Sequence, residues 1–401
     1  MATQFFKRYI QLESSAGIFL ILVTSLALIV DNSPLRFFYH AFFNYHLTLH
    51  LGVINLSKSV LLWVNEGLMT IFFLLVGLEI KREMIEGELN SLSKAMLPAF
   101  AALGGMVVPT LFYIAFNYHD VAALRGWAIP VATDIAFSLG VLSLLGKRIP
   151  PAVKVFLTAL AIFDDLMAVV IIAVFYTNHI YQIYLLLALL LTLILLIMNR
   201  LNVVRITPYV VVSAVMWVCV LKSGVHATLT GIVMAFAIPL KGKKSKAAKK
   251  DDTTPSHAES PLKKLEHALH PWVAFLVIPI FAFANAGVSF EGLSLDYFVT
   301  PITLGIATGL FFGKQIGIWL FSFLSIRFGW ATKPARLSLS GIYGVSLIAG
   351  MGFTMSLFVG SLSFIERTEV FSPMVRVGVL VGSFLSGLAG YLFLRFFAYR
   401  K

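Results

Sequence analysis

The chain consists mainly of long apolar runs that glycines, prolines and charged residues interrupt. A membrane-spanning helix needs roughly 20 mostly apolar residues, and runs of that length recur along the whole sequence. The pattern predicts an all-α polytopic membrane protein with about twelve spans, near residues 12–30, 60–85, 95–116, 122–145, 151–176, 181–199, 205–221, 223–240, 262–288, 300–325, 337–362 and 373–397. The pair 205–221 and 223–240 is short and shares the hinge KSG.

Lysines and arginines separate the loops into two sets. Of the 31 basic residues, 24 fall on one side of the predicted spans and 6 on the other. The positive-inside rule makes the first side cytoplasmic, with both termini and a basic loop at 241–261 on that side. Lys314 is left over, because it lies mid-span in GLFFGKQIGIWLF with no loop in reach.

Three acidic residues also lie mid-span, namely Asp134, Asp164 and Asp165. A charge at the centre of a membrane helix is costly and usually marks a transport pathway or has a buried partner. Structural ion pairs between helices are the plainer interpretation. Three acids against the single base Lys314 nevertheless leave a surplus of carboxylates, which a purely structural network would not need. The surplus therefore favours a functional site.

Two of the predicted spans contain helix breakers at their centres. Pro130 precedes Thr133 and Asp134 in AIPVATDIAFSLG, and SLIAGMGFTMSLFVG (346–360) has two mid-span glycines before Thr354. Close packing through small residues is an alternative for the second segment. Each broken span is the middle helix of a three-helix group, 95–176 or 300–397. Breaks at matching positions of two inverted repeats are typical of a transporter with its binding site at the midplane.

Broken helices leave partial charges inside the membrane, positive at helix starts and negative at helix ends. Asp134 can offset facing positive ends. Lys314 can offset negative ends near 350–354, or it can pair with Asp164. Neighbouring residues on a helix point about 100° apart. We therefore expect one member of the Asp164–Asp165 pair to face a cavity and the other to face a neighbouring helix.

Composition agrees with a membrane protein, since 59% of residues are hydrophobic and 12% are charged. Soluble domains carry about 25% charged residues. The net charge of +12 does not indicate nucleic-acid binding, because the basic residues lie in loops at the ends of the predicted spans. The lone Cys219 forms no internal disulfide. Segment 44–58 alternates polar and apolar residues around Gly52, which predicts a β-hairpin outside the membrane; an amphipathic interfacial strand is the alternative.

Several long segments resemble the NhaA family of sodium/proton antiporters. They include FFLLVGLEIKREMIEGEL, AIPVATDIAFSLGVLSLLGKRIP, FLTALAIFDDLMAVVIIAVFYTN, VLKSGVHATLTGIVMAFAIPLK, LEHALHPWVAFLVIPIFAFANAGVS, GLFFGKQIGI and GMGFTMSLFV. The likeness covers nearly the whole chain, and the family is itself a known example of inverted repeats with broken helices. It implies one transporter domain, 1–401, of twelve spans, with the fourth and eleventh unwound and crossing.

The resemblance also implies function. It predicts a pH-regulated, electrogenic exchanger of Na⁺ or Li⁺ for H⁺ in a bacterial inner membrane, forming a homodimer through the hairpin, without enzymatic activity or a cofactor. Asp165 would bind the cation, with Asp164 beside it and paired to Lys314, while Asp134 and Thr133 lie at the helix break. A pH-sensing cluster is implied at the cytoplasmic surface, formed by Glu79, Arg82, Glu83, Glu266, His267 and His270. Ordinary interfacial charge is the alternative for that cluster.

Three other functions fit parts of the pattern. A retinal pump would have seven spans with its lysine in the last, whereas Lys314 lies in the tenth. An intramembrane aspartyl protease needs a Gly-x-Gly-Asp motif, and GMGF at 350–353 lacks the acid. A cation-coupled symporter on the same inverted-repeat fold would need room for an organic substrate, but Phe137, Phe163 and Phe353 crowd this region. The symporter remains the alternative to antiport.

Overall fold

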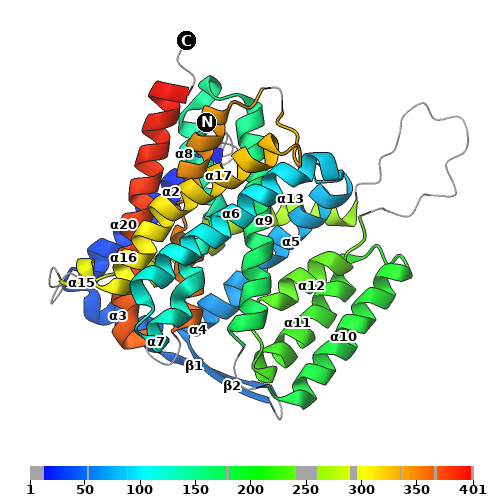
Figure 1. Ribbon diagram of the computed structural model, residues 1–401. Helices are drawn as coiled ribbons and strands as arrows, with labels where there is room; N and C mark the ends of the chain where they lie inside the picture. Colours follow the sequence, from blue (N-terminus) through cyan, green and yellow to red (C-terminus); the bar gives the residue numbers. More distant parts are fainter. Residues whose placement is uncertain are drawn as a thin grey trace, which may run out of the picture.

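A computed structural model describes residues 13–51, 54–87, 89–177, 180–240, 260–289, 296–334, 336–364 and 368–398. Within these residues the chain is a bundle of helices with one small sheet (Figure 1). Eight helices are long and apolar enough to span a membrane, and up to eleven spans result if each of three bent pairs counts as one. The predicted span 223–240 is helical only over α12 (Leu229–Ala237). The described residues therefore confirm a polytopic helical protein but leave the predicted total of twelve open.

Most predicted spans correspond to helices with shifted ends. The bounds are α2 Glu13–Asp31, α4 Val60–Trp63 continuing through η1 Val64–Leu68 into α5 Met69–Ile85, α6 Leu92–Asn117, α9 Pro151–Phe175, α10 Gln182–Arg200, α11 Ile206–Ser223, α13 Pro261–Trp272 continuing through η4 Val273–Val277 into α14 Ile278–Ala286, α16 Pro301–Thr308 continuing through η5 Gly309–Gly313 into α17 Lys314–Arg327, and α20 Thr368–Phe393 with η7 Leu394–Ala398. The last helix begins at Thr368 rather than at residue 373, so Pro373 lies inside the helix near its start. A proline so close to a helix start removes few backbone bonds.

The two predicted breaks are present. The first broken span consists of α7 (Val121–Leu124) and the 3-10 turn η2 (Arg125–Val131), followed by α8 (Ile135–Leu144) at a 43° bend. The second consists of α18 (Leu339–Ile348) and α19 (Phe353–Ser363) at a 50° bend. The two breaks touch, because the Asp134 N–H donates to the Met351 carbonyl oxygen at 2.7 Å.

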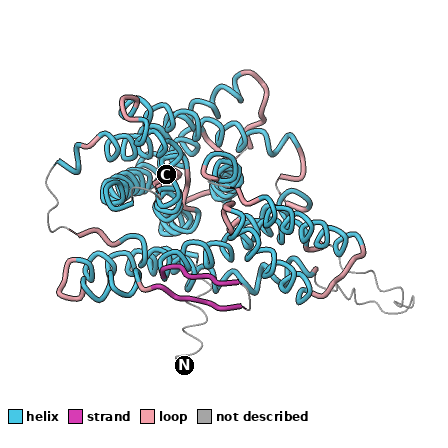
Figure 2. Tube along the Cα trace, turned by 90° about the horizontal axis from the view of Figure 1, so that it is seen from below, coloured by secondary structure: helices cyan, strands magenta, loops and turns pink. Residues whose placement is uncertain are grey.

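The predicted hairpin is also present. Strands β1 (His46–Leu51) and β2 (Ile54–Ser59) pair antiparallel, with Leu47 opposite Lys58. Figure 2 shows them lying across the helix ends at one end of the bundle. A helix that the sequence did not predict, α3 (Arg36–Asn44), leads into β1 and turns 107° away from α2. Its exposed Phe37 and Phe38, beside the buried Tyr39, are typical of a helix lying at a membrane surface.

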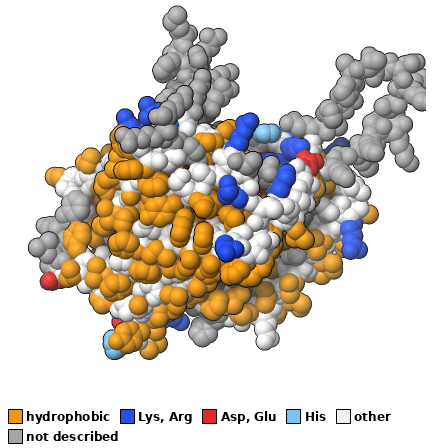
Figure 3. Space-filling view, turned by 45° about the horizontal axis from the view of Figure 1, so that its top comes forward, with side chains coloured by type: hydrophobic (Ala, Val, Ile, Leu, Met, Phe, Trp, Pro, Cys, Tyr) orange, Lys and Arg blue, Asp and Glu red, His pale blue; other side chains and the backbone are white. Residues whose placement is uncertain are grey.

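The helices form two packed groups. Helices α10, α11 and α12 lie side by side on one flank and share a buried cluster with Leu78 of α5 (Figure 1). The larger group contains both broken spans. The start of α13 and the end of α20 lie at the end of the bundle opposite the hairpin (Figure 1). Figure 3 shows a broad belt of apolar side chains with lysines and arginines gathered along its rim, as expected for a protein that crosses a bilayer.

One short α-helix and one 3-10 turn complete the description of the chain. Helix α15 (Asp296–Val299) precedes α16, and the 3-10 turn η3 (Gly146–Arg148) connects α8 to α9. The basic loop predicted at 241–261 lies almost wholly outside the described residues, which resume at Ser260.

Candidate cation and proton site

The site begins with two neighbouring carboxylates on α9. Asp164 and Asp165 lie near the middle of this 25-residue helix, and each side chain is buried. Because they are adjacent in sequence, their side chains leave the helix in different directions. The two carboxylates therefore lie in different surroundings.

Asp164 has two partners at one of its carboxylate oxygens. Its Oδ2 lies 2.5 Å from Lys314 Nζ and 2.6 Å from the Thr133 hydroxyl. Lys314 also donates to Thr133 Oγ1 at 3.0 Å, so one buried network joins α9, α17 and the break between η2 and α8. Thr133 in turn lies 2.8 Å from the Ala349 carbonyl oxygen at the end of α18. The hydroxyl therefore joins the ion pair to both helix breaks.

Lys314 is fully buried, and next to it α17 and α6 approach each other closely at Gly317 and Gly104. A Cβ built on Gly317 would come 2.1 Å from the Gly104 carbonyl oxygen, so only glycine fits at this approach. The π-helical turn η5 ends directly before Lys314. Such turns are frequent at functional sites, since they rotate the following residue to a new face of the helix.

Asp134 caps both half-helices that start at the breaks. Its Oδ1 accepts from the Phe137 N–H of α8 at 2.9 Å, and its Oδ2 accepts from the Thr354 N–H of α19 at 3.0 Å. The Thr354 hydroxyl also donates to Oδ2 at 2.5 Å. One carboxylate thus faces two partially positive helix starts, which is the electrostatic role expected for it.

Thr354 was absent from the site residues that we inferred from the sequence. A signal for it existed, because it follows the second break as Thr133 follows the first. What sequence reasoning lacked was the pairing between the breaks, which brings residues 134 and 354 together.

Asp165 contrasts with these residues. Both of its carboxylate oxygens are buried, and neither has a hydrogen-bond partner among the residues that the structure describes. A buried carboxylate without a partner is costly in its charged form. It is stabilised by taking up a proton or by binding a cation, and a hard cation such as Na⁺ prefers oxygen ligands.

The predicted pH-sensing residues lie on facing ends of α5 and α13. Arg82 Nε donates to both oxygens of Glu266 at 3.0 and 3.1 Å, and Arg82 Nη1 lies 2.7 Å from Glu83 Oε1. Glu79 lies one turn earlier on α5 and is partly buried. His267 and His270 are exposed and have no hydrogen bond or ion pair within the described ranges. Four of the six residues therefore gather in one cluster, while the two histidines face outward.

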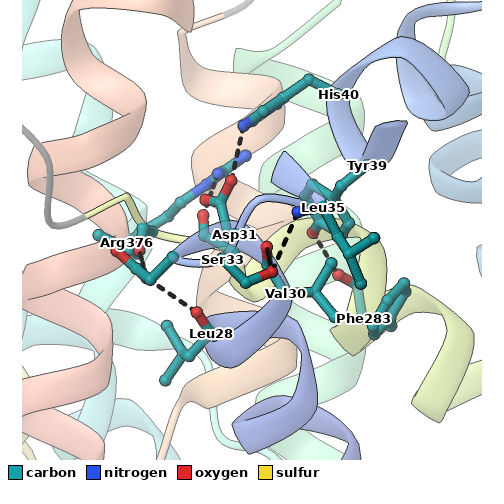
Figure 4. Close-up of polar contacts among 12 residues, drawn as sticks. Leu28, Val30, Asp31, Ser33, Leu35, Tyr39, His40, Phe283 and Arg376 are labelled. Atoms are coloured by element: carbon teal, nitrogen blue, oxygen red, sulfur yellow. Dashed lines mark hydrogen bonds and ion pairs between the residues drawn. The ribbon is translucent and has the colours of Figure 1, made fainter. Parts of the chain in front are cut away.

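A further polar cluster at the hairpin end of the bundle was not found from the sequence (Figure 4). His40 Nε2 of α3 lies 2.7 Å from Asp31 Oδ1 at the end of α2. Arg376 of α20 donates to the Gly287 carbonyl oxygen, and the Tyr39 hydroxyl donates to the Phe283 carbonyl oxygen at 2.5 Å. Burial raises the pKa of Tyr39 to about 12, so its hydroxyl keeps its proton. These contacts fix α3 against α2, and α20 against the end of α14.

Comparison with known proteins gives one consistent result. The family model described as "Na+/H+ antiporter 1" matches residues 7–394. The chain is 48% identical over 386 residues to the "Na(+)/H(+) antiporter NhaA 1" of Pseudomonas putida, covering 96% of this chain and 94% of the relative. It is 50% identical over 390 residues to "Na(+)/H(+) antiporter NhaA" of Aeromonas salmonicida, covering 97% and 95%. A protein of the same name from Bordetella parapertussis is 50% identical over 394 residues, covering 98% and 97%.

Proposed function

The chain belongs to the NhaA-type family of Na⁺/H⁺ antiporters, and we propose that it exchanges Na⁺ or Li⁺ for H⁺ across a bacterial inner membrane. The symporter alternative has no support in these relatives, since each is named as an antiporter. The observation that carries the proposal is the buried and unpartnered carboxylate of Asp165. Such a group holds either a proton or a cation, and competition between the two is the basis of exchange.

In this proposal Asp165 is the main cation ligand and Asp164 completes the site. Burial makes an uncompensated charge on Asp165 unfavourable, so Na⁺ must displace a proton from its oxygens. Thr133 and the carbonyl groups freed at the helix breaks are further oxygen ligands within the same region. Exchange then requires that the site open to one face of the membrane at a time. The meeting of the two half-helix pairs at Asp134 supports the breaks as the moving element.

Lys314 acts in this proposal chiefly as a fixed positive charge. Its positive charge offsets the negative charge of the Asp164 carboxylate directly, so among the described residues the site keeps one uncompensated carboxylate, Asp165, when no cation is bound. Asp134 neutralises the two helix starts, so each buried charge except Asp165 has a partner among the described residues. Electrogenic exchange would require that the protons moved in each cycle carry more charge than the cation moved in the opposite direction.

We further propose that Arg82, Glu83, Glu266 and Glu79 tune activity to pH. Their support is the ion-paired cluster at the ends of α5 and α13, where protonation of one carboxyl breaks a contact between two spans. His267 and His270 would act only through exposed charge, since they touch none of these groups in the described part of the chain. The cluster would face the cytoplasm together with both termini, in line with the basic residues on this side.

The homodimer is proposed to form through the hairpin. A two-stranded sheet leaves the outer edge of each strand without a β-partner, and such edges pair readily with a second chain. The repeat relation between 95–176 and 300–397 is likewise supported by the matching breaks, each held between two long helices.

Transport in proteoliposomes tests the function. The purified protein is reconstituted, an inward-acidic pH gradient is formed, and NaCl, LiCl or KCl is added while a lumenal pH dye is followed. We expect Na⁺ and Li⁺ to dissipate the gradient and K⁺ to leave it unchanged. A gradient that survives Na⁺, or that falls only when an organic co-substrate is present, would contradict antiport.

A further inference from the structure

A groove of about 350 Å³ runs between α2, α8 and α20, outside the site described above. Ile21 and Ser25 of α2 line one wall, and Val141 and Leu144 of α8 line a second. Along its rim Ile21, Leu144 and Phe384 are 41%, 50% and 68% exposed. These residues belong to the spanning part of the bundle, so the groove opens toward the bilayer. Its apolar lining suits a hydrocarbon chain.

The floor of this groove is formed by the helix breaks themselves. Phe137, Met351 and Phe353 line it; the backbones of the first two bond to Asp134, and that of the third bonds to α20. The Met351 carbonyl accepts from the Asp134 N–H, and the Phe137 N–H donates to Asp134 Oδ1. The Phe353 N–H donates to Ser383 Oγ of α20 at 3.1 Å. A molecule in the groove would therefore pack against the residues that hold Asp134.

Two arginines follow the lining residues of the groove along the chain. On α20 its lining recurs at every helical turn through Ser383, Gly387 and Tyr391, and the next position in that row is Arg395. Arg395 Nη1 donates to the Tyr391 hydroxyl at 2.9 Å. On α8 the lining ends at Leu144, the last residue of the helix, and Arg148 follows four residues later in the 3-10 turn η3. Both arginines are exposed at the basic end of the bundle.

The length of the groove matches one leaflet of a membrane. On α20 the lining runs from Leu380 to Tyr391, eleven positions apart, which is roughly 16 Å along a helix. Half of the hydrocarbon core of a bilayer is about 15 Å thick. A chain lying at the breaks therefore places its headgroup at the level of Arg148 and Arg395, where arginine recognises phosphate well.

We propose that this groove binds one anionic phospholipid, with an acyl chain against Phe137, Met351 and Phe353 and its phosphate between Arg148 and Arg395. The bound chain supports the packing of α2 and α20 around the two breaks. The lipid thereby stabilises the crossing that Asp134 caps, and its occupancy raises exchange. This second part rests on the proposed antiport, whereas binding does not.

Native mass spectrometry of the purified full-length protein in detergent tests binding. Phosphatidylglycerol and phosphatidylcholine with identical chains are titrated separately. We expect one phosphatidylglycerol to remain bound, with roughly tenfold or greater preference over phosphatidylcholine. Ser25→Trp fills the groove and should remove this lipid. Leu22→Trp, on the same helix but outside the groove, should keep it.

The headgroup contacts are tested by changing both arginines together. Arg148→Gln with Arg395→Gln should lower phosphatidylglycerol affinity roughly tenfold, and the paired lysine variants should restore most of it. Elution as a single peak in size-exclusion chromatography shows that each variant is folded. Equal retention of the two lipids, equal retention by the two tryptophan variants, or loss of a second protomer instead of a lipid would each overturn the proposal.

Transport separates this inference from the proposed function. In proteoliposomes of phosphatidylcholine, adding phosphatidylglycerol should raise the Na⁺-driven rate of the wild type and of Leu22→Trp at least twofold, but not that of Ser25→Trp. Lipid binding without any Na⁺-driven exchange would contradict the antiporter and leave the lipid site standing. Exchange by the wild type that ignores phosphatidylglycerol would overturn the proposed coupling.

Discussion

The buried cluster at the helix breaks and the charged cluster at the ends of α5 and α13 contain similar residues in different surroundings. At the breaks, Asp164 and Lys314 are 2% and 0% exposed, and their contact includes the Thr133 hydroxyl. At the helix ends, Arg82 is 34% exposed and is shared between Glu83 and Glu266. Removing a partner from the first cluster leaves a charge in an apolar interior, while water can replace a lost partner in the second.

This difference in exposure suits the two regions to different roles. Removing one member of a buried ion pair lowers the stability of the folded protein by about 3–5 kcal/mol. A partly exposed pair contributes roughly 0.2–1 kcal/mol. The first cluster is therefore suited to hold a fixed geometry around Asp165. The second is suited to change its pairing with pH at little cost to the fold. Substitutions in the two clusters should therefore differ in how far they change transport and stability.

Asp165→Asn should lower Na⁺-driven proton release at least ~100-fold, because an amide neither releases the proton nor supplies the negative charge. Thermal stability should not fall, since the substitution removes a carboxylate that has no partner among the described residues. Transport is measured with a lumenal pH dye, and stability by the midpoint of thermal unfolding. A variant that exchanges at more than a tenth of the wild-type rate would refute Asp165 as the main ligand.

Asp164→Asn provides the matched comparison on the same helix. It should lower stability by about 3–5 kcal/mol, because Lys314 then stays buried without its carboxylate. Exchange should be less affected than in Asp165→Asn if Lys314 finds another partner. Equal melting temperatures for the two variants would remove the distinction between a paired and an unpaired carboxylate.

Lys314→Ala and Lys314→Arg separate charge from proton transfer. Alanine leaves Asp164 unpaired and should destabilise the protein by about 3–5 kcal/mol. Arginine keeps the charge at every physiological pH, so electrogenic exchange should persist if Lys314 is a fixed charge. The measurement is the membrane current after a Na⁺ jump in proteoliposomes, on protein whose thermal unfolding shows that it is folded. Electroneutral exchange by Lys314→Arg would instead identify Lys314 as a proton carrier.

Thr354→Val should reduce stability by about 1–3 kcal/mol, because the Asp134 carboxylate loses a buried hydroxyl donor. Na⁺ affinity should fall as the two half-helix starts lose their shared cap. Thr354→Ser keeps the hydroxyl and should restore both properties. Unfolding midpoints and the Na⁺ concentration for half-maximal exchange report the result, and equal values for valine and serine would exclude the cap.

Glu266→Gln should move the pH profile of exchange by less than about one unit, with the maximal rate within about twofold. The profile should move to lower pH, because the cluster loses a negative charge and releases protons more readily. Glu86→Gln is the control, since Glu86 forms a half-exposed pair with Lys263 at the same end of the bundle. If the pH profiles of the two variants coincide, the Arg82 cluster is ordinary interfacial charge with no specific role in pH regulation.

Sequence patterns located the main parts of the site before any contact was known. The hydropathy pattern identified Asp134, Asp164, Asp165 and Lys314, since no loop or helix end accounts for them. Prolines and glycines marked both breaks. The hydropathy pattern did not predict α3 or the Asp31–His40 contact, because a helix of only nine amphipathic residues next to a span gives a weak sequence signal.

From sequence patterns it follows that this protein crosses a membrane, carries a surplus carboxylate there and breaks two of its helices. Those features follow from the cost of burying charge and from local backbone chemistry, which act within a few residues. The Asp164–Lys314 pair, expected from the family resemblance, is present in the structure. Only the tertiary contacts reveal that Asp134 caps α8 and α19 together and that Asp165 has no partner among the described residues. The helical period fixes only that neighbours diverge by about 100°. Which side chain then finds a partner depends on the close approach of α6 and α17 and on the meeting of the two breaks, residues far apart in the chain.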